Sequence, residues 1–89
     1  DPAKAQDRYE ELLSQLPNTT EKDEVATRSF SASEGEIRGY GFLDAPRGIV
    51  LFINCGSNQC TGPDDAAALA KIVHDRIKQL LPMALGGRP

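Results

Sequence analysis

The sequence contains no tryptophan, one methionine, one histidine and two cysteines among its 89 residues. One histidine and two cysteines are too few soft ligands for a four-ligand zinc site made of these residue types. The chain also has no apolar run near the roughly 20 residues that a transmembrane helix needs. We therefore expect no metal, no cofactor and no membrane insertion of the domain itself, although an N-terminal anchor outside the given chain would leave no trace.

Positive charge is also scarce. Nine acidic and four basic side chains give residues 1–36 a net charge of −5, and four acidic and six basic side chains give residues 37–89 a net charge of +2. Proteins that bind nucleic acid usually carry clustered Lys and Arg. The sequence has no such cluster, so we expect no nucleic-acid partner.

Two segments have the periodicity of amphipathic helices, with apolar residues three and four positions apart. The first covers residues 2–16. The second covers residues 63–81, and its start at Pro63-Asp64-Asp65 suits the first turn of a helix, where proline is tolerated and carboxylates complement the dipole. We expect the remaining residues, 82–89, to form a flexible tail.

The residues between the helices, 25–54, predict a sheet of three strands. Residues 25–32 and 37–43 alternate weakly, whereas Gly48 to Cys55 is the only unbroken apolar run and is dominated by β-branched and aromatic residues. That run predicts a central strand buried on both faces. Turn residues at 44–48 predict antiparallel pairing with the strand before it, and the polar segment 17–24 predicts an exposed connector.

The order helix-strand-strand-strand-helix predicts an α+β fold of two layers, in which both helices cover one face of a three-stranded antiparallel meander. Tyr40 and Phe42 would then lie on the uncovered face. Gly39 and Gly41 leave bare backbone on the other side of the same strand. We interpret that gap as room for a helix or an aromatic ring, with a ligand as the alternative.

The same element order occurs in double-stranded-RNA-binding domains, which hold phosphates with lysines at the start of their last helix. Here Asp64 and Asp65 stand at that place and reverse the charge. The loop before them also lacks the lysine of a phosphate-binding loop. The shared order therefore indicates no shared function.

Cys55 and Cys60 are four residues apart, at a predicted strand end and in a loop rich in turn-forming residues. We favour a structural disulfide, which would stabilise the fold by about 2 kcal/mol through its effect on the unfolded chain. Two free thiols, a redox pair and half of a metal site are the alternatives. A disulfide predicts an extracytoplasmic location, in a periplasm, a cell envelope lipoprotein or a secreted protein.

His74 falls between Lys71 and Lys78 on the predicted solvent side of the last helix. No nucleophile or orienting carboxylate can be assigned to it from sequence, so we expect a solvated surface histidine and a protein that is not an enzyme. A hydrolase would require a deep pocket that contains His74 and a carboxylate.

We therefore predict a non-enzymatic extracytoplasmic module that binds another protein or has a structural role, stapled by a short disulfide loop. A thiol-disulfide redox protein that uses the same two cysteines is the alternative. The predicted contact residues lie on the second strand and in the loop between the cysteines: Arg38, Tyr40, Phe42, Ser57, Asn58 and Gln59.

Overall fold

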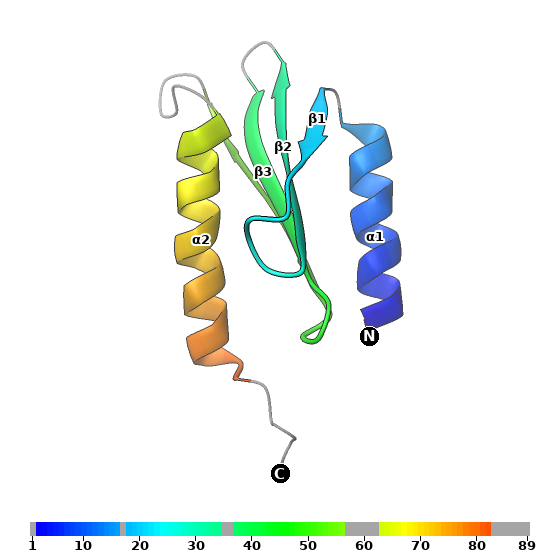
Figure 1. Cartoon of the computed structure of the whole chain (residues 1–89), viewed down its shortest axis with the longest axis vertical. Coiled ribbons are helices and arrows are strands. Elements are labelled where there is room, and N and C mark those ends of the chain that lie inside the picture. Colours follow the sequence, from blue (N-terminus) through cyan, green and yellow to red (C-terminus); the bar gives the residue numbers. More distant parts are fainter. Residues whose placement is uncertain (1, 17, 35–36, 57–62, 83–89) are drawn as a thin grey trace.

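The computed structural model describes residues 2–16, 18–34, 37–56 and 63–82 (Figure 1). The chain runs through α1 (Pro2–Gln15), β1 (Thr19–Glu21), β2 (Arg28–Glu34), β3 (Ile37–Asp44), β4 (Ile49–Cys55) and α2 (Pro63–Leu80). The predicted α+β class and the antiparallel meander between two helices are confirmed. The tail beyond residue 82 lies outside the described residues.

The sheet has four strands in the order β1-β2-β3-β4, each antiparallel to the next. The additional strand, β1, lies in the polar segment that we interpreted as a connector. It is short, and Thr19 pairs with Ala32 of β2. At the β3–β4 turn, Gly48 adopts a φ of 67° and its N–H donates to the carbonyl of Ala45 at 3.0 Å, so the turn is the one that its residues predict.

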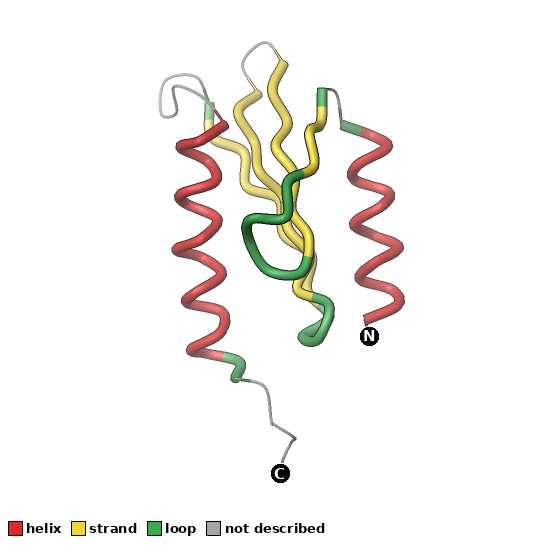
Figure 2. Tube along the Cα trace, in the orientation of Figure 1, coloured by secondary structure: helices red, strands yellow, loops and turns green. Residues whose placement is uncertain are grey.

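The two helices lie on opposite faces of the sheet, so the molecule has three layers (Figures 1 and 2). Tyr9 of α1 packs in one buried cluster with Leu43, and Ala70 of α2 packs in the other with Phe42. Our expectation of two layers with an uncovered face is wrong. Because β3 sends Phe42 to one face and Leu43 to the other, both faces need a cover.

The bare face of β3 is filled by aromatic rings from the strands on either side. A Cβ on Gly39 would collide with the ring of Phe52, and a Cβ on Gly41 would lie 2.5 Å from the ring of Phe30. These two rings are stacked with their centroids 6.0 Å apart, and Tyr9 meets Phe30 edge-on at 5.5 Å. The predicted close packing against Gly39 and Gly41 is confirmed.

The strand that we placed at the centre of the sheet is an edge strand. Among the described residues β4 pairs with β3 alone, and its residues 49–53 are partly exposed. β3 lies inside the sheet, and all its residues from Gly39 to Asp44 are buried. The unbroken apolar run reflects helices on both faces of the sheet, which contact β4 from either side. An apolar run of this kind does not show whether a strand has neighbours on both sides or on one side only.

We expect Gly41→Ala to lower the free energy of unfolding by about 1–3 kcal/mol, the usual cost of overpacking a core. The Phe30 ring that the new methyl group would meet is fully buried and is held between Tyr9 and Phe52. Gly56→Ala is the matched control, because a Cβ there would meet nothing within 4 Å. Urea denaturation followed by circular dichroism measures both variants, and equal midpoints would show that the ring has room to move.

Candidate functional site

The only histidine of the sequence, His74 of α2, is buried between that helix and the sheet. His74 is 8% exposed, its Nε2 lies 2.9 Å from Oδ2 of Asp44, and its ring centroid lies 5.2 Å from that of Phe42. Our expectation of a solvated surface histidine is wrong. The histidine meets the end of β3, 30 residues away in the chain, and helix periodicity alone does not reveal such a partner.

Asp44 ties the β3–β4 turn to the helix. Its carboxylate accepts hydrogen bonds from the backbone N–H of Arg47 at 3.2 Å and from Nη1 of Arg47 at 3.0 Å, and Nε of Arg47 donates to the carbonyl of Leu81 at 2.7 Å. Burial raises the pKa of Asp44, but the hydrogen bonds from His74 and Arg47 outweigh it and hold that pKa below its ordinary value. The carboxylate is therefore charged at neutral pH.

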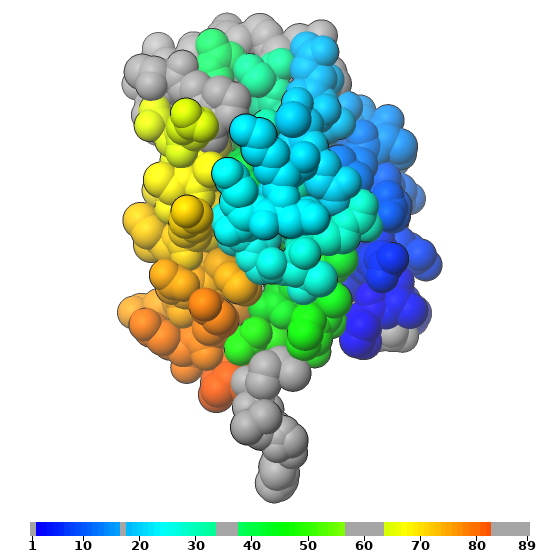
Figure 3. Space-filling view, viewed as in Figure 1, coloured from blue at the N-terminus to red at the C-terminus, as the bar shows by residue number. Residues whose placement is uncertain are grey.

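The loop between β1 and β2 folds over the sheet toward α2 (Figure 2). The Ser29 hydroxyl accepts hydrogen bonds from the backbone N–H groups of Glu24 and Val25 at 3.0 and 3.1 Å, and it lies 2.8 Å from the hydroxyl of Tyr40. Ala26 adopts a φ of 59°. Residues 25–27 therefore belong to this loop and not to the first predicted strand. Figure 3 shows the loop covering the sheet between the two helices.

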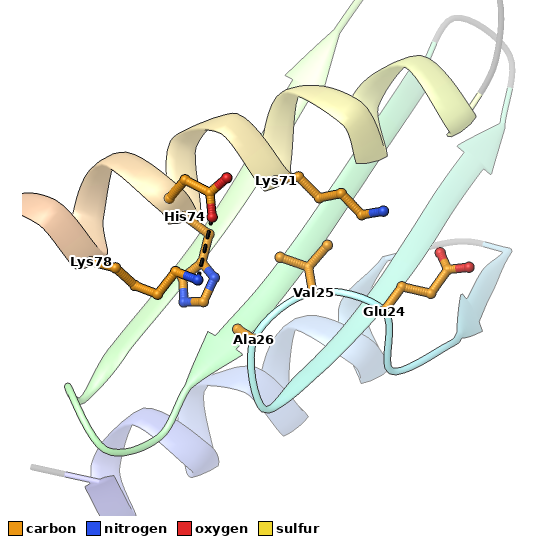
Figure 4. Close-up of a pocket in the computed structure, with 7 residues that line it drawn as sticks. Glu24, Val25, Ala26, Lys71, His74 and Lys78 are labelled. Carbon is orange, nitrogen blue, oxygen red and sulfur yellow. Dashed lines mark ion pairs between the residues drawn. The ribbon is translucent and has the colours of Figure 1, made fainter.

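A groove of about 430 Å³ lies between this loop and α2 (Figure 4). Lys71 and Lys78 extend along its upper side, but Glu24 and Asp75 also border it, and Nζ of Lys78 lies 3.3 Å from Oδ1 of Asp75. The opposite charges balance, so the groove offers no selective site for an anion or a cation. Its lining residues are Glu24, Val25, Ala26, Lys71, His74, Asp75 and Lys78.

The polar cluster of Asp44, Arg47 and His74 borders a second, smaller groove. Asp44 and His74 line part of this groove of about 200 Å³, and the hydroxyl of Thr27, which also lines it, accepts a hydrogen bond from the backbone N–H of Ala45 at 3.0 Å. Among the residues that the structure describes, no serine or cysteine lines either groove. Within the described ranges, no group of three or more His, Cys, Asp or Glu is arranged to hold a metal ion. The contacts of Asp44 with His74 and Arg47, and of Arg47 with the carbonyl of Leu81, tie α2 to the β3–β4 turn and give this cluster a structural role.

The contact surface predicted on β3 is not at the surface. Tyr40 and Phe42 are 2% and 0% exposed and pack beneath α2, so their assignment as exposed contact residues is wrong. The physical reason is the cover that α2 provides for this face of the sheet. Arg38, near the start of β3, is partly exposed. Ser57, Asn58 and Gln59 lie outside the described residues.

The function that we predicted from the two cysteines also needs correction. Of the two, only Cys55 lies among the described residues, where it is buried in the cluster under α2; Cys60 falls in the segment 57–62. The part of the chain that the structure describes thus contains no cysteine pair at bonding distance. Neither a module defined by a disulfide-stapled loop nor a redox protein that uses the same pair is supported. The extracytoplasmic location stays a prediction.

The two edges of the sheet differ in length and charge. β1 has three residues, and its Glu21 accepts a 2.7 Å hydrogen bond from Nε of Arg28, which also pairs with Glu10 and lies over the ring of Tyr9. β4 has seven residues, Ile-Val-Leu-Phe-Ile-Asn-Cys, with no charge and no proline. Short length, charge and proline are the usual protections of edge strands. β1 has two of these protections and β4 has none.

The helix beside β4 adds exposed apolar side chains. Leu69 and Leu80 of α2 are 43% and 68% exposed. Each is two residues from a lysine of the groove, Lys71 or Lys78, and therefore points about 200° away from it around the helix. Since the groove lies on the β1–β2 side of α2, these leucines face the β4 side. We name the outer edge of β4 together with Leu69 and Leu80 the β4 surface.

The β4 surface did not emerge from the sequence, because the apolar run of residues 49–55 predicts a strand inside the sheet. The only available signal was the lack of charge in residues 49–55, and a central strand shows the same pattern. Comparison with known proteins finds no matching family model, curated protein or solved structure. Neither described helix is long and apolar enough to span a bilayer. We take the β4 surface as the candidate functional site because, among the described residues, β4 pairs on one side only and exposed leucines lie beside it.

We expect Asp44→Asn to lower the free energy of unfolding by about 1–3 kcal/mol at neutral pH, because it weakens charge-assisted hydrogen bonds. The folded pKa of Asp44 lies below the unfolded one, so its stabilisation is present above the unfolded pKa and is lost as the pH falls through the folded pKa. Urea titrations at neutral and strongly acidic pH should show the difference between wild type and variant shrinking in acid. Asp75→Asn, at an exposed position, is the control, and a difference independent of pH would contradict this assignment.

Replacing Ser29 with Ala leaves two backbone N–H groups of the loop without their acceptor, and we expect a loss of about 1–3 kcal/mol. Amide hydrogen exchange measured by NMR should accelerate at Glu24 and Val25 beyond the global change in stability. Ser31→Ala, on the same face of β2 and only partly buried, serves as control. Equal exchange in both variants would show that another group holds the loop.

Proposed function

We propose that this chain binds polypeptides by accepting a β-strand at the open edge of β4, and that it acts without catalysis. The observation that carries the proposal is the contrast between a protected edge at β1 and a seven-residue, uncharged edge at β4. Strand addition satisfies the outward backbone groups of such an edge, and alternate side chains provide selectivity. The proposal keeps a protein as the partner and moves the contact from β3 to β4.

The side chains of β4 support an apolar partner strand. Val50 and Phe52 pack in the cluster beneath α1, and Leu51 and Ile53 pack in the cluster beneath α2. All four remain partly exposed. An added strand would therefore find apolar side chains above and below its own plane. Apolar and β-branched residues are expected at its alternate positions.

The acceptor edge is also held in place. β4 pairs with β3 over all seven residues, from Asp44–Ile49 to Arg38–Cys55. The turn that leads into it is anchored to α2 through Asp44, His74 and Arg47. A rigid edge loses little conformational entropy when it binds, which favours affinity.

A phage-displayed library of random linear peptides, selected against the immobilised protein, tests this function. We expect enriched peptides to be apolar, β-branched and free of proline. Synthetic versions should shift the amide NMR signals of residues 49–54 and leave those of β1 unchanged. Two results would contradict the proposal. One is that the selected peptides bind at another surface, and the other is that no peptide is enriched when the protein is immobilised at a density low enough to keep its molecules apart.

A further inference from the structure

We infer that the strand accepted by β4 is the β4 of a second copy of this chain, so that two molecules form a two-fold dimer with one continuous sheet. This inference rests on the proposed function and adds the identity of the partner. A two-fold axis perpendicular to the sheet pairs the two β4 strands antiparallel. It also places both α2 helices on the same face and both α1 helices on the other.

The register follows from the length of the strand. All seven residues of the two strands, Ile49–Cys55, overlap only when Phe52 of one copy lies opposite Phe52 of the other, because Phe52 is the middle residue. Residues whose numbers sum to 104 are then opposite each other, so that Leu51 of one copy faces Ile53 of the other. Both of these residues lie on the α2 face. Such apolar cross-strand pairs are the ones that stabilise antiparallel sheets.

The exposed leucines of α2 favour a second copy over an isolated peptide. A single added strand lies in the plane of the sheet and would leave Leu69 and Leu80, which stand above that plane, largely in water. A second copy brings its own α2 to the same side, so that the leucines of each copy face the α2 of the other. A partner with a helix above its strand therefore explains why Leu69 and Leu80 are exposed in the single chain.

The charges of α2 also suit this arrangement. The two-fold axis makes the two α2 helices antiparallel, so the N-terminal half of one lies beside the C-terminal half of the other. On the β4 side of α2, Asp65 lies in the first turn and Arg76 toward the end of the helix. Opposite charges and opposite helix dipoles thus come together. β4 itself carries no charge that would meet its own copy across the axis.

Sedimentation equilibrium of the full chain over a range of concentrations tests the inference. We expect a monomer–dimer equilibrium that weakens about tenfold or more in Leu69→Lys and in Leu80→Lys, since each substitution places two charges in the interface. Gln6→Lys adds the same charge on an exposed position of α1 and is the matched control. Because Leu69 and Leu80 are exposed in the single chain, thermal unfolding of each variant at concentrations where it is monomeric should match wild type.

The register of the two β4 strands can be measured separately by NMR. In an equimolar mixture of isotope-labelled and unlabelled chains, filtered NMR spectra should show contacts between the methyl groups of Leu51 in one molecule and Ile53 in the other. Amide exchange in residues 49–54 should also slow as the protein concentration rises. Concentration-independent exchange in β4, or intermolecular contacts confined to another surface, would overturn the inference.

Sedimentation and peptide binding together distinguish a wrong partner from a wrong function. A chain that stays monomeric at all concentrations, while selected peptides still shift the signals of β4, accepts foreign strands only and overturns the inference alone. A monomer whose β4 binds no selected peptide overturns both. A dimer that neither lysine substitution weakens has its interface elsewhere and also overturns the inference.

Discussion

Closure of aromatic rings over the two glycines of β3 is the contact on which the rest of this small core depends. Phe30 reaches over Gly41 from β2 and Phe52 reaches over Gly39 from β4, so the two strands on either side of β3 meet above its backbone. Tyr9 then packs α1 onto the same stack. A side chain at either glycine would separate these strands and lift the helix, because interiors are packed too closely to absorb an extra group without a shift.

The other face of the sheet combines apolar packing with buried polar groups that have found partners. Ser29 supports the loop over β2, and Asp44 holds both His74 and Arg47 beneath α2. Buried polar groups are costly when they lack partners, and both of these have several. The arrangement orients α2 relative to the sheet. It thereby sets the positions of the two exposed leucines beside β4.

Much of the fold can be predicted from local patterns, whereas the site cannot. Helical periodicity located α1 and α2, and turn residues located the β3–β4 hairpin. The three-residue β1 has too little pattern to be recognised, and its place depends on pairing with β2. The unbroken run of β4 suggested burial on both faces, which the helices on either side provide, but its position at the edge depends on the other strands. The Asp44–His74 pair is likewise a tertiary contact that residue spacing does not encode.

The protection of β1 has a consequence for how far association can proceed. Fibrous growth by strand pairing requires a molecule that is open at both ends of its sheet, so that each new subunit presents a fresh site. In this molecule the three residues of β1 and the Glu21–Arg28 pair leave one end closed. The assembly that we propose through β4 therefore stops at a pair and does not extend into a filament.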